Sequence, residues 1–225
     1  MAKRPVFVAK AVWPFCEVIE TQFTFFNGFA ISQKQKSVKS LHDSFKKAFP
    51  MEVLEISTKS TEELGARLSA FNLTTDMGDR EISLECAFQG SKCFENGGPY
   101  KDIYEMTPLE AKKDPRLKES GNLIGFELHG THFSNEPKDF FYNWIYSKAL
   151  FEHKEYLQEL LKYGAFTDIE FNPARMLNCQ AKAVATVVGL IRAGLLEACM
   201  ADQSVFLEKV YRIEQKERYE QLSFF

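Results

Sequence analysis

The chain has 225 residues, of which 45% are hydrophobic and 14% aromatic, including 21 phenylalanines. This composition excludes a disordered chain and suffices for one soluble globular domain with a sizeable core. The formal net charge of −3 excludes a protein that coats nucleic acid with its whole surface, but it allows a local basic patch.

The cysteines and the N-terminus are typical of a protein inside the cell. The cysteines number five, an odd count, and form no CxxC pair, which indicates reduced thiols rather than a disulfide framework. The N-terminal segment lacks the apolar core of a signal peptide, because Lys10, Pro14 and Glu17 interrupt it. No run of about 20 apolar residues occurs in the chain. We therefore expect a cytoplasmic protein without a membrane span.

The first fifth of the chain predicts a β-hairpin followed by a helix. Residues 6–9 and 17–26 predict strands, the second with alternating apolar and polar side chains. An Asn-Gly pair directly after the second strand is a strong turn signal. A helix over 32–47 follows, with Ser32 as the candidate N-cap.

The predicted helix over 32–47 is strongly basic. Its charged residues are Lys34, Lys36, Lys39, Asp43, Lys46 and Lys47. Such a run is usually a solvated face. It also fits a surface on which the phosphates of a DNA strand dock, for which Lys34, Lys36 and Lys39 are the candidates. The residues alone leave both interpretations open.

A strand over 52–57, a helix over 61–69 and a loop over 72–79 lead to the stretch that carries most of the chemistry. That stretch, 83–94, predicts a helix, and the Gly-Gly-Pro turn at 97–99 ends it. The two glycines allow the backbone to approach a ligand closely, although such a turn is a weak signal for phosphate binding.

One face of the predicted 83–94 helix carries a carboxylate, an aromatic ring, an amide and an amine. They belong to Glu85, Phe88, Gln89 and Lys92. The spacing i, i+3, i+4 and i+7 places them on one face, and a rise of about 1.5 Å per residue separates the first from the last by roughly 10 Å. A lysine in apolar surroundings loses its proton readily, and the neutral amine attacks carbonyl carbon. The same spacing occurs on ordinary helices with solvated Glu and Lys, so spacing alone does not decide.

The second half of the chain alternates helices and strands. The predicted segments are a helix between Thr107 and Pro115, a strand over 122–133, helices over 137–151 and 154–163, a strand over 166–172, a helix capped by Asn178, and a last helix over 204–220. This order predicts an α+β fold dominated by helices, with a few short strands. We expect a single domain over residues 1–225, with the hairpin and basic helix of 1–60 packed on its core.

Three further features of this half concern a binding site. Asp168 and Glu170 alternate onto one side of their predicted strand, either facing a ligand or forming a loop rim. Trp144 belongs to an aromatic stripe typical of a core, although such a ring can also stack on adenine. His129 and His132 form the only tight histidine pair and have no further ligands at suitable spacing. We therefore expect neither a metal site nor a cofactor.

Several motifs resemble the NADAR family. The helix motif from Glu85 to Lys92 is similar to that family's V-E-H-x-F-Q-A-x-K, and the stretch from Leu68 to Asn72 is similar to its L-S-N-F. The chain resembles in particular the NADAR antitoxins paired with DarT-type DNA ADP-ribosyltransferase toxins. This closer likeness extends over nearly the whole chain and includes residues 88–92, 97–100, 166–173 and 178–181.

The resemblance implies a single NADAR-like domain that binds ADP-ribose derivatives and cleaves an N-glycosidic bond. Its toxin-linked branch implies removal of ADP-ribose from guanine in DNA, in functional pairing with a DarT-type toxin. On that substrate, Lys92 is the expected nucleophile that forms a Schiff base, Glu85 moves protons, and Asp168 is a second carboxylate facing the ribose. The expected substrate-binding residues are Phe71, Phe88, Gln89, Trp144 and Asn178.

The chain also departs from the family pattern. Cys86 stands where the family usually has a histidine, and residues 170–172 replace a Trp-Gly element. Two other functions stay open, namely a small-molecule N-glycosidase of riboflavin-pathway type and a non-catalytic protein that binds ADP-ribose or the toxin. The presence of both Glu85 and Lys92 favours catalysis, and the basic helix weakly favours DNA. The sequence indicates no particular oligomeric state.

Overall fold

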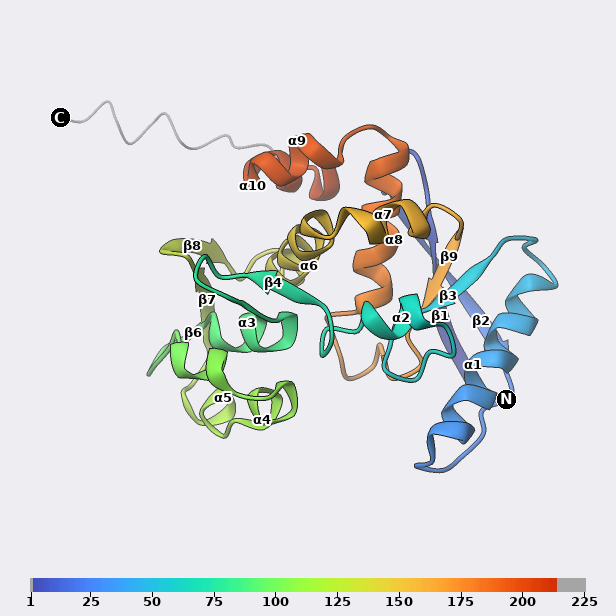
Figure 1. Ribbon diagram of the computed structural model, residues 1–225, viewed down its shortest axis with the longest axis horizontal. Coiled ribbons are helices and arrows are strands. Elements are labelled where there is room, and N and C mark those ends of the chain that lie inside the picture. Colours follow the sequence, from blue (N-terminus) through green and yellow to red (C-terminus); the bar gives the residue numbers. More distant parts are fainter. Residues whose placement is uncertain (1, 214–225) are drawn as a thin grey trace.

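Residues 2–213 are described in the structure, a computed structural model (Figure 1). The fold is α+β and helix-dominated, as the sequence predicts. The predicted last helix over 204–220 extends past the described residues. Within them, this region forms α10 (Gln203–Phe206) and a π-helical turn at Leu207–Tyr211.

The largest sheet combines strands from both halves of the chain. Its strands are β1 (Ala2–Ala9), β2 (Cys16–Phe23), β3 (Val53–Glu55) and β9 (Ala165–Thr167), in the order β2-β1-β9-β3. β1 and β2 form the predicted antiparallel hairpin, which residues 10–15 connect, and the Asn-Gly pair follows β2 as the sequence indicates. β9 pairs antiparallel with β1 and parallel with β3. The chain therefore leaves the middle of this sheet immediately before Asp168.

Helices cover both faces of this sheet. On one face, α1 (Ile31–Lys46) packs over a cluster that contains Val6 and Val8 of β1. The intervening Phe7 belongs to the larger core, to which α8 (Gln180–Arg192) contributes from the other face. This division follows from the period-2 alternation of a strand. The predicted N-cap Ser32 is wrong, because the helix already begins at Ile31.

A second hairpin precedes the central motif. It consists of β4 (Thr74–Asp76) and β5 (Glu81–Ser83), and it follows the short helix α2 (Glu63–Arg67). The predicted loop over 72–79 is therefore partly wrong, since it contains a strand. The turn between the strands includes Gly78 at a φ of +93°, a conformation that side chains rarely allow.

A third sheet follows α3 (Leu84–Gly90) and consists of three antiparallel strands. They are β6 (Lys92–Phe94), β7 (Leu123–Leu128) and β8 (Thr131–Ser134). The predicted single strand over 122–133 is wrong, because His129 and Gly130 both adopt positive φ angles, 52° and 74°, and turn the chain.

Short helices fill the connection from β6 to β7. They are a 3-10 helix (Lys101–Glu105), α4 (Pro108–Lys113) and α5 (Arg116–Glu119). α4 begins with the capping box of Thr107 and Glu110 that its sequence indicates. α4 packs against α3 and so brings its own lysines to the side of the motif helix.

The centre of the protein is α6 (Phe140–Glu152), which packs between α3 and α8 (Figure 1). Most of its side chains are buried, and its apolar residues surround the helix instead of forming one stripe, as is usual for a core helix. α7 (Lys154–Leu160) follows in the predicted place, and α9 (Leu196–Ala201) packs on the far end of α6.

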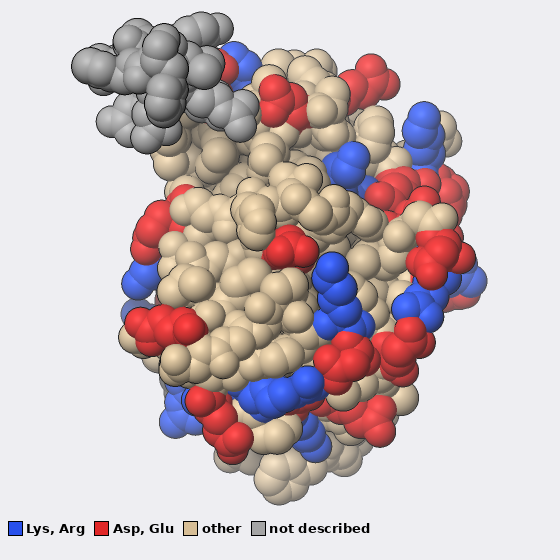
Figure 2. Space-filling model, turned by 90° about the vertical axis from the view of Figure 1, so that its left-hand side faces the viewer, with Lys and Arg blue, Asp and Glu red and all other residues tan. Residues whose placement is uncertain are grey.

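The surface opposite the main sheet carries both signs of charge. Figure 2 shows acidic and basic side chains interspersed around a broad uncharged area on the side formed by the third sheet. This mixture agrees with the small net charge of the chain. Across residues 2–213, no helix combines the length and the apolar character needed to cross a bilayer.

Candidate active site

A cavity of about 410 Å³ lies where α3, α4, the loop after β3 and the chain after β9 meet. Its lining includes most of the residues singled out in the sequence, namely Phe71, Glu85, Phe88, Gln89, Lys92, Asp168 and Asn178. These residues come from four separate parts of the chain, so the fold and not the sequence order gathers them. We refer to this cavity as the candidate active site.

The motif helix is shorter than predicted. α3 ends at Gly90, and Lys92 is the first residue of β6, so the helical spacing of roughly 10 Å between Glu85 and Lys92 is wrong. Only glycine fits at the last residue of the helix, since a Cβ on Gly90 would lie 2.4 Å from the ring of Tyr104. The Lys92 side chain nevertheless turns back over the helix, with its Nζ 4.8 Å from the ring centroid of Phe88.

Lys92 is electrostatically poised to lose its proton. Burial lowers the pKa of its ammonium group from 10.5 to about 8, the Glu85 carboxylate opposes this shift, and the Lys112 cation adds to it. Desolvation therefore outweighs attraction to the carboxylate. At pH 7, roughly a tenth of such a group is a neutral amine, which is the nucleophilic form.

Glu85 is buried at the start of α3 and is held by two neighbours. Its Oε1 accepts a hydrogen bond from Gln89 Nε2 at 2.8 Å and lies 4.0 Å from Lys112 Nζ. The other end of the Gln89 amide, Oε1, is buried without a hydrogen-bond partner among the described residues. Because buried acceptors are rarely left unpaired, this oxygen is available to a hydroxyl of a ligand.

Two lysines that we did not predict from the sequence, Lys59 and Lys112, line the same cavity. Lys112 reaches it from α4, with its Nζ 5.3 Å from the ring centroid of Phe71. Lys59 reaches it from the loop after β3, where its Nζ donates to Thr58 Oγ1 at 2.9 Å. Both cations face a site that also contains carboxylates, which suits a ligand carrying phosphates.

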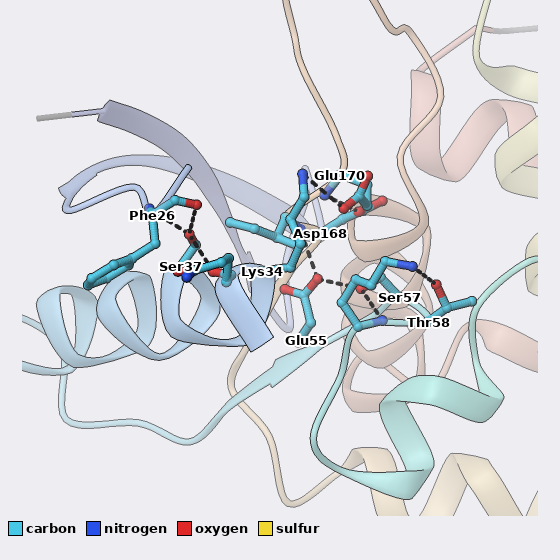
Figure 3. Close-up of polar contacts among 11 residues, drawn as sticks. Phe26, Lys34, Ser37, Glu55, Ser57, Thr58, Asp168 and Glu170 are labelled. Carbon is cyan, nitrogen blue, oxygen red and sulfur yellow. Dashed lines mark hydrogen bonds and ion pairs between the residues drawn. The ribbon is translucent and has the colours of Figure 1, made fainter. Parts of the chain in front are cut away.

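Asp168 lies one residue beyond the end of β9 and is buried (Figure 3). Its Oδ1 accepts the Glu170 backbone N–H at 3.0 Å, and its Oδ2 accepts Gln180 Nε2 at 3.1 Å. Burial, together with the neighbouring Glu55 carboxylate, raises the pKa of Asp168 to about 7. Asp168 and Glu170 both line the cavity, but they do so from the turn after β9, and the predicted strand over 166–172 is wrong because it ends at Thr167.

Of the two remaining candidates for substrate binding, Asn178 and Trp144, one lies in the cavity and the other does not. Asn178 lines the cavity but makes no capping hydrogen bond to α8, whose N-cap residue is Cys179. Its Oδ1 is buried and unpaired within the described part of the chain. Trp144 does not line the cavity and packs against Phe133, with ring centroids 4.8 Å apart. The structure therefore brings Asn178, but not Trp144, to the candidate active site.

The basic helix α1 reaches the rim of the cavity through one residue. Lys34 Nζ lies 3.3 Å from Glu170 Oε1, and Glu170 lines the cavity (Figure 3). Lys36 is exposed, and Lys39 forms an exposed ion pair with Asp43 at 2.7 Å. A long substrate that leaves the cavity past Glu170 would therefore meet α1.

The chemistry of this arrangement is that of a nucleophile with acid–base support. A partly neutral amine, an ionisable Asp near pH 7 and a second buried carboxylate line one cavity. Such a set can attack an electrophilic carbon and transfer protons to and from the leaving group. Within residues 2–213, no cluster of three His, Cys, Asp or Glu side chains is arranged to hold a metal ion.

Comparison with known proteins identifies one family. The family model described as DarT1-associated NADAR antitoxin matches residues 2–220, which is almost the whole chain and includes every residue discussed above. None of the curated proteins compared with the chain matches it.

Proposed function

The chain belongs to the DarT1-associated NADAR antitoxin family, and from this membership we propose that it is a glycohydrolase that removes ADP-ribose from guanine bases in DNA. Membership pairs the chain with a DarT1 toxin. Beyond family membership, we propose the reaction and the substrate, so that the antitoxin acts as an enzyme that removes the ADP-ribose added to DNA.

The observation that carries the proposal is the lowered pKa of Lys92 inside the cavity. An amine with a pKa of about 8 lies in one cavity with the carboxylates of Glu85 and Asp168. A protein that only bound ADP-ribose would have no use for a desolvated lysine, because burial weakens its charge and costs stability. A nucleophile requires this neutral form.

The residues support a covalent route. The Lys92 amine adds to the anomeric carbon of the distal ribose as the bond from that carbon to guanine breaks, and guanine leaves with a proton supplied by Asp168. The lysine and the sugar are then joined as a glycosylamine, whose nitrogen gives a proton to Glu85. The bond from the anomeric carbon to the ring oxygen breaks next, Glu85 passes the proton to that oxygen, and the lysine and the opened sugar are joined as a protonated imine. Glu85 takes a proton from the water that adds to the imine carbon, the bond to the lysine nitrogen breaks with the hydroxyl proton moving to that nitrogen, and the aldehyde closes to ADP-ribose. Glu85 then returns its proton to solvent, and Asp168 takes one up.

The remaining lining residues suit the rest of ADP-ribose. Lys59 and Lys112 supply two cations for its diphosphate. The unpaired oxygens of Gln89 and Asn178 can accept hydrogen bonds from ribose hydroxyls. The ring of Phe71, already beneath the Lys112 cation, offers an aromatic surface for a base.

The DNA strand that carries the modified guanine would lie over α1. Lys34 stands at the rim next to Glu170, and Lys36 and Lys39 follow on the exposed side of the same helix. Because these cations neutralise phosphates without reading bases, they would contribute affinity rather than sequence preference.

The test is to incubate the purified protein with ADP-ribosylated DNA, unmodified DNA and free pyrimidine nucleotides, and to measure the ADP-ribose or base released from each. We expect release of ADP-ribose from the modified DNA alone. Cleavage of a free nucleotide, with the modified DNA left intact, would contradict the proposal in favour of a small-molecule N-glycosidase. Binding of ADP-ribose without cleavage would contradict it in favour of a reader.

A further inference from the structure

We propose that Glu55, Thr167 and His42 form a proton relay that connects solvent on the α1 side of the protein with the Glu55 carboxylate, whose charge acts on Asp168 of the candidate active site. The relay lets Asp168 release its proton into the cavity while Glu55 takes up another from outside. Its use in catalysis rests on the proposed function, whereas its existence as a hydrogen-bonded path does not.

A continuous chain of hydrogen bonds forms the path. His42 Nε2 lies 2.8 Å from Thr167 Oγ1, and Thr167 Oγ1 donates to Glu55 Oε2 at 2.6 Å. Glu55 and Thr167 are 2% and 0% exposed, so water cannot replace these contacts. His42 is only partly buried and lines a separate cavity of about 440 Å³ beside α1, where it meets solvent.

Glu55 is fixed directly beside Asp168 (Figure 3). Its Oε2 accepts the Thr167 hydroxyl, and its Oε1 accepts the backbone N–H of Ile169 at 2.8 Å, so it is bound by the residues on both sides of Asp168. Ser57 holds the same Oε1 with a hydroxyl hydrogen bond of 2.7 Å. Burial raises the pKa of Glu55, and the Glu55 charge in turn raises that of Asp168. Two neighbouring buried carboxylates favour a state in which only one of them is ionised.

The hydrogen bonds can reverse as a unit, with every proton accounted for. A hydroxyl has a single hydrogen, so while Thr167 donates to ionised Glu55, the bond from His42 must be donated by Nε2–H. When Nδ1 of His42 takes a proton from water, Nε2 passes its own to Thr167, and Thr167 passes its hydroxyl hydrogen to Glu55. The result is a neutral Glu55 and a His42 ring protonated on Nδ1 alone. Burial lowers the pKa of His42 to about 4, so the ring is neutral in both end states.

The catalytic benefit concerns charge. Without the relay, proton release by Asp168 would leave two adjacent buried carboxylates ionised, which is costly in a desolvated site. With it, Glu55 gains a proton as Asp168 loses one, and the pair carries one negative charge throughout. Asp168 is thereby a stronger acid at the moment when guanine needs a proton.

Other ionisable groups face this network and must be considered in its pH dependence. They are Asp43, Lys46 and Glu52 around His42, and Glu170, Tyr142, Tyr146 and Cys179 around the carboxylate pair. The tyrosines and the cysteine have raised pKa values because of burial, so they stay neutral near pH 7. Glu170 is ion-paired with Lys34.

The first experiment needs no substrate. We would record the ring nitrogens of His42 by NMR at about pH 7 in the wild type and in Glu55→Gln, whose side-chain N–H can donate to Thr167 as a protonated Glu55 would. We expect the ring to be neutral in both, with its proton on Nε2 in the wild type and on Nδ1 in Glu55→Gln. Adding Thr167→Ser to Glu55→Gln should retain this switch, and adding Thr167→Val should abolish it. The same tautomer in the wild type and in Glu55→Gln, or the same switch with Thr167→Val, would overturn the relay.

The second experiment measures turnover on ADP-ribosylated DNA. Thr167→Val should slow ADP-ribose release by roughly tenfold or more, and Thr167→Ser should restore the wild-type rate. If Thr167→Val does not fold, His42→Phe serves instead, because it removes the solvent end of the relay and leaves Glu55 and Asp168 in place. Unchanged rates would overturn the catalytic use. If the wild type itself releases no ADP-ribose, the proposed function fails, and the His42 measurement still decides on the relay.

Discussion

The strongest prediction concerns Lys92, which we would replace by arginine and by methionine. Arginine keeps the positive charge and most of the length but cannot form an imine. Methionine keeps an apolar stem of similar reach and removes the charge. The pair of variants therefore separates a nucleophilic role from an electrostatic one.

The structure gives the size of the effect. Burial lowers the pKa of Lys92 from 10.5 to about 8. At pH 7, the neutral fraction rises from roughly 0.03% to roughly 9%, a gain of about 300-fold in nucleophile. Both variants lose the nucleophile itself, so we expect ADP-ribose release to fall by about three orders of magnitude or more. The fold should be intact in each, since Lys92 lies at the edge of the core rather than within it.

The assay has two parts. Steady-state release of ADP-ribose from modified DNA gives the rate, and borohydride added during turnover should trap a covalent adduct at residue 92 in the wild type only. A matched control is Lys101→Arg, because Lys101 is an exposed lysine outside the cavity. If Lys92→Arg remains fully active, or no adduct is trapped, the lysine is only an electrostatic contact and the covalent route is refuted.

Lys92→Met should also change the stability of the fold. Because the folded pKa of Lys92 lies below the unfolded value, the unfolded chain binds more protons between about pH 8 and pH 10.5, and stability rises with pH through that window. At pH 7 the full cost of burying the ammonium remains. Lys92→Met should therefore increase the free energy of unfolding by about 1–3 kcal/mol at pH 7 and by less above pH 10. Denaturant unfolding at the two pH values measures this difference.

Three further predictions follow from the site. Activity should show a bell-shaped pH profile with an optimum near pH 7.5, between the pKa of Asp168 at about 7 and that of Lys92 at about 8, because one must be protonated and the other neutral. Lys112→Met should raise the pKa of Lys92 and move that optimum to higher pH, and an unmoved profile would show that the two cations do not interact. Replacing Lys34, Lys36 and Lys39 together by glutamine should make the salt dependence of DNA affinity shallower by up to about 3 in slope while sparing a modified nucleoside, and an unchanged slope would leave α1 as a solvated face.

Local pattern predicted which motif residues share a site better than it predicted their geometry. Side-chain spacing and the family resemblance placed Glu85, Phe88, Gln89 and Lys92 in one site, and all four line one cavity. The helix that justified this grouping ends at Gly90, where the ring of Tyr104 packs in the place of a side chain. That contact joins residues 14 positions apart, and no periodicity within the motif reveals it.

Residues that long-range packing brings to the site could not be predicted from the sequence. Lys112 enters the site only because α4 packs on α3, and Glu55 lies beside Asp168, outside the cavity lining, only because β3 pairs in parallel with β9. Trp144 shows the opposite error, since an aromatic residue on an apolar helix has the same pattern whether it faces a core or a ligand. Parallel pairing and helix contacts are set by tertiary structure, to which local patterns are nearly blind.

The ionisable groups of the site lower the stability of the fold, and this cost is an argument for a catalytic role. A desolvated lysine, a buried Asp with a raised pKa and a second buried carboxylate beside it each hold a charge where burial disfavours it. Apolar residues of similar size would stabilise the same positions. Lys92 and Asp168 line one cavity, and Glu55 is held beside Asp168 by hydrogen bonds from Thr167 and Ile169. A protein that acted only by covering its substrate or its toxin would gain nothing from concentrating this cost in one place, whereas an enzyme that must hold a neutral amine next to a protonated acid near pH 7 requires it.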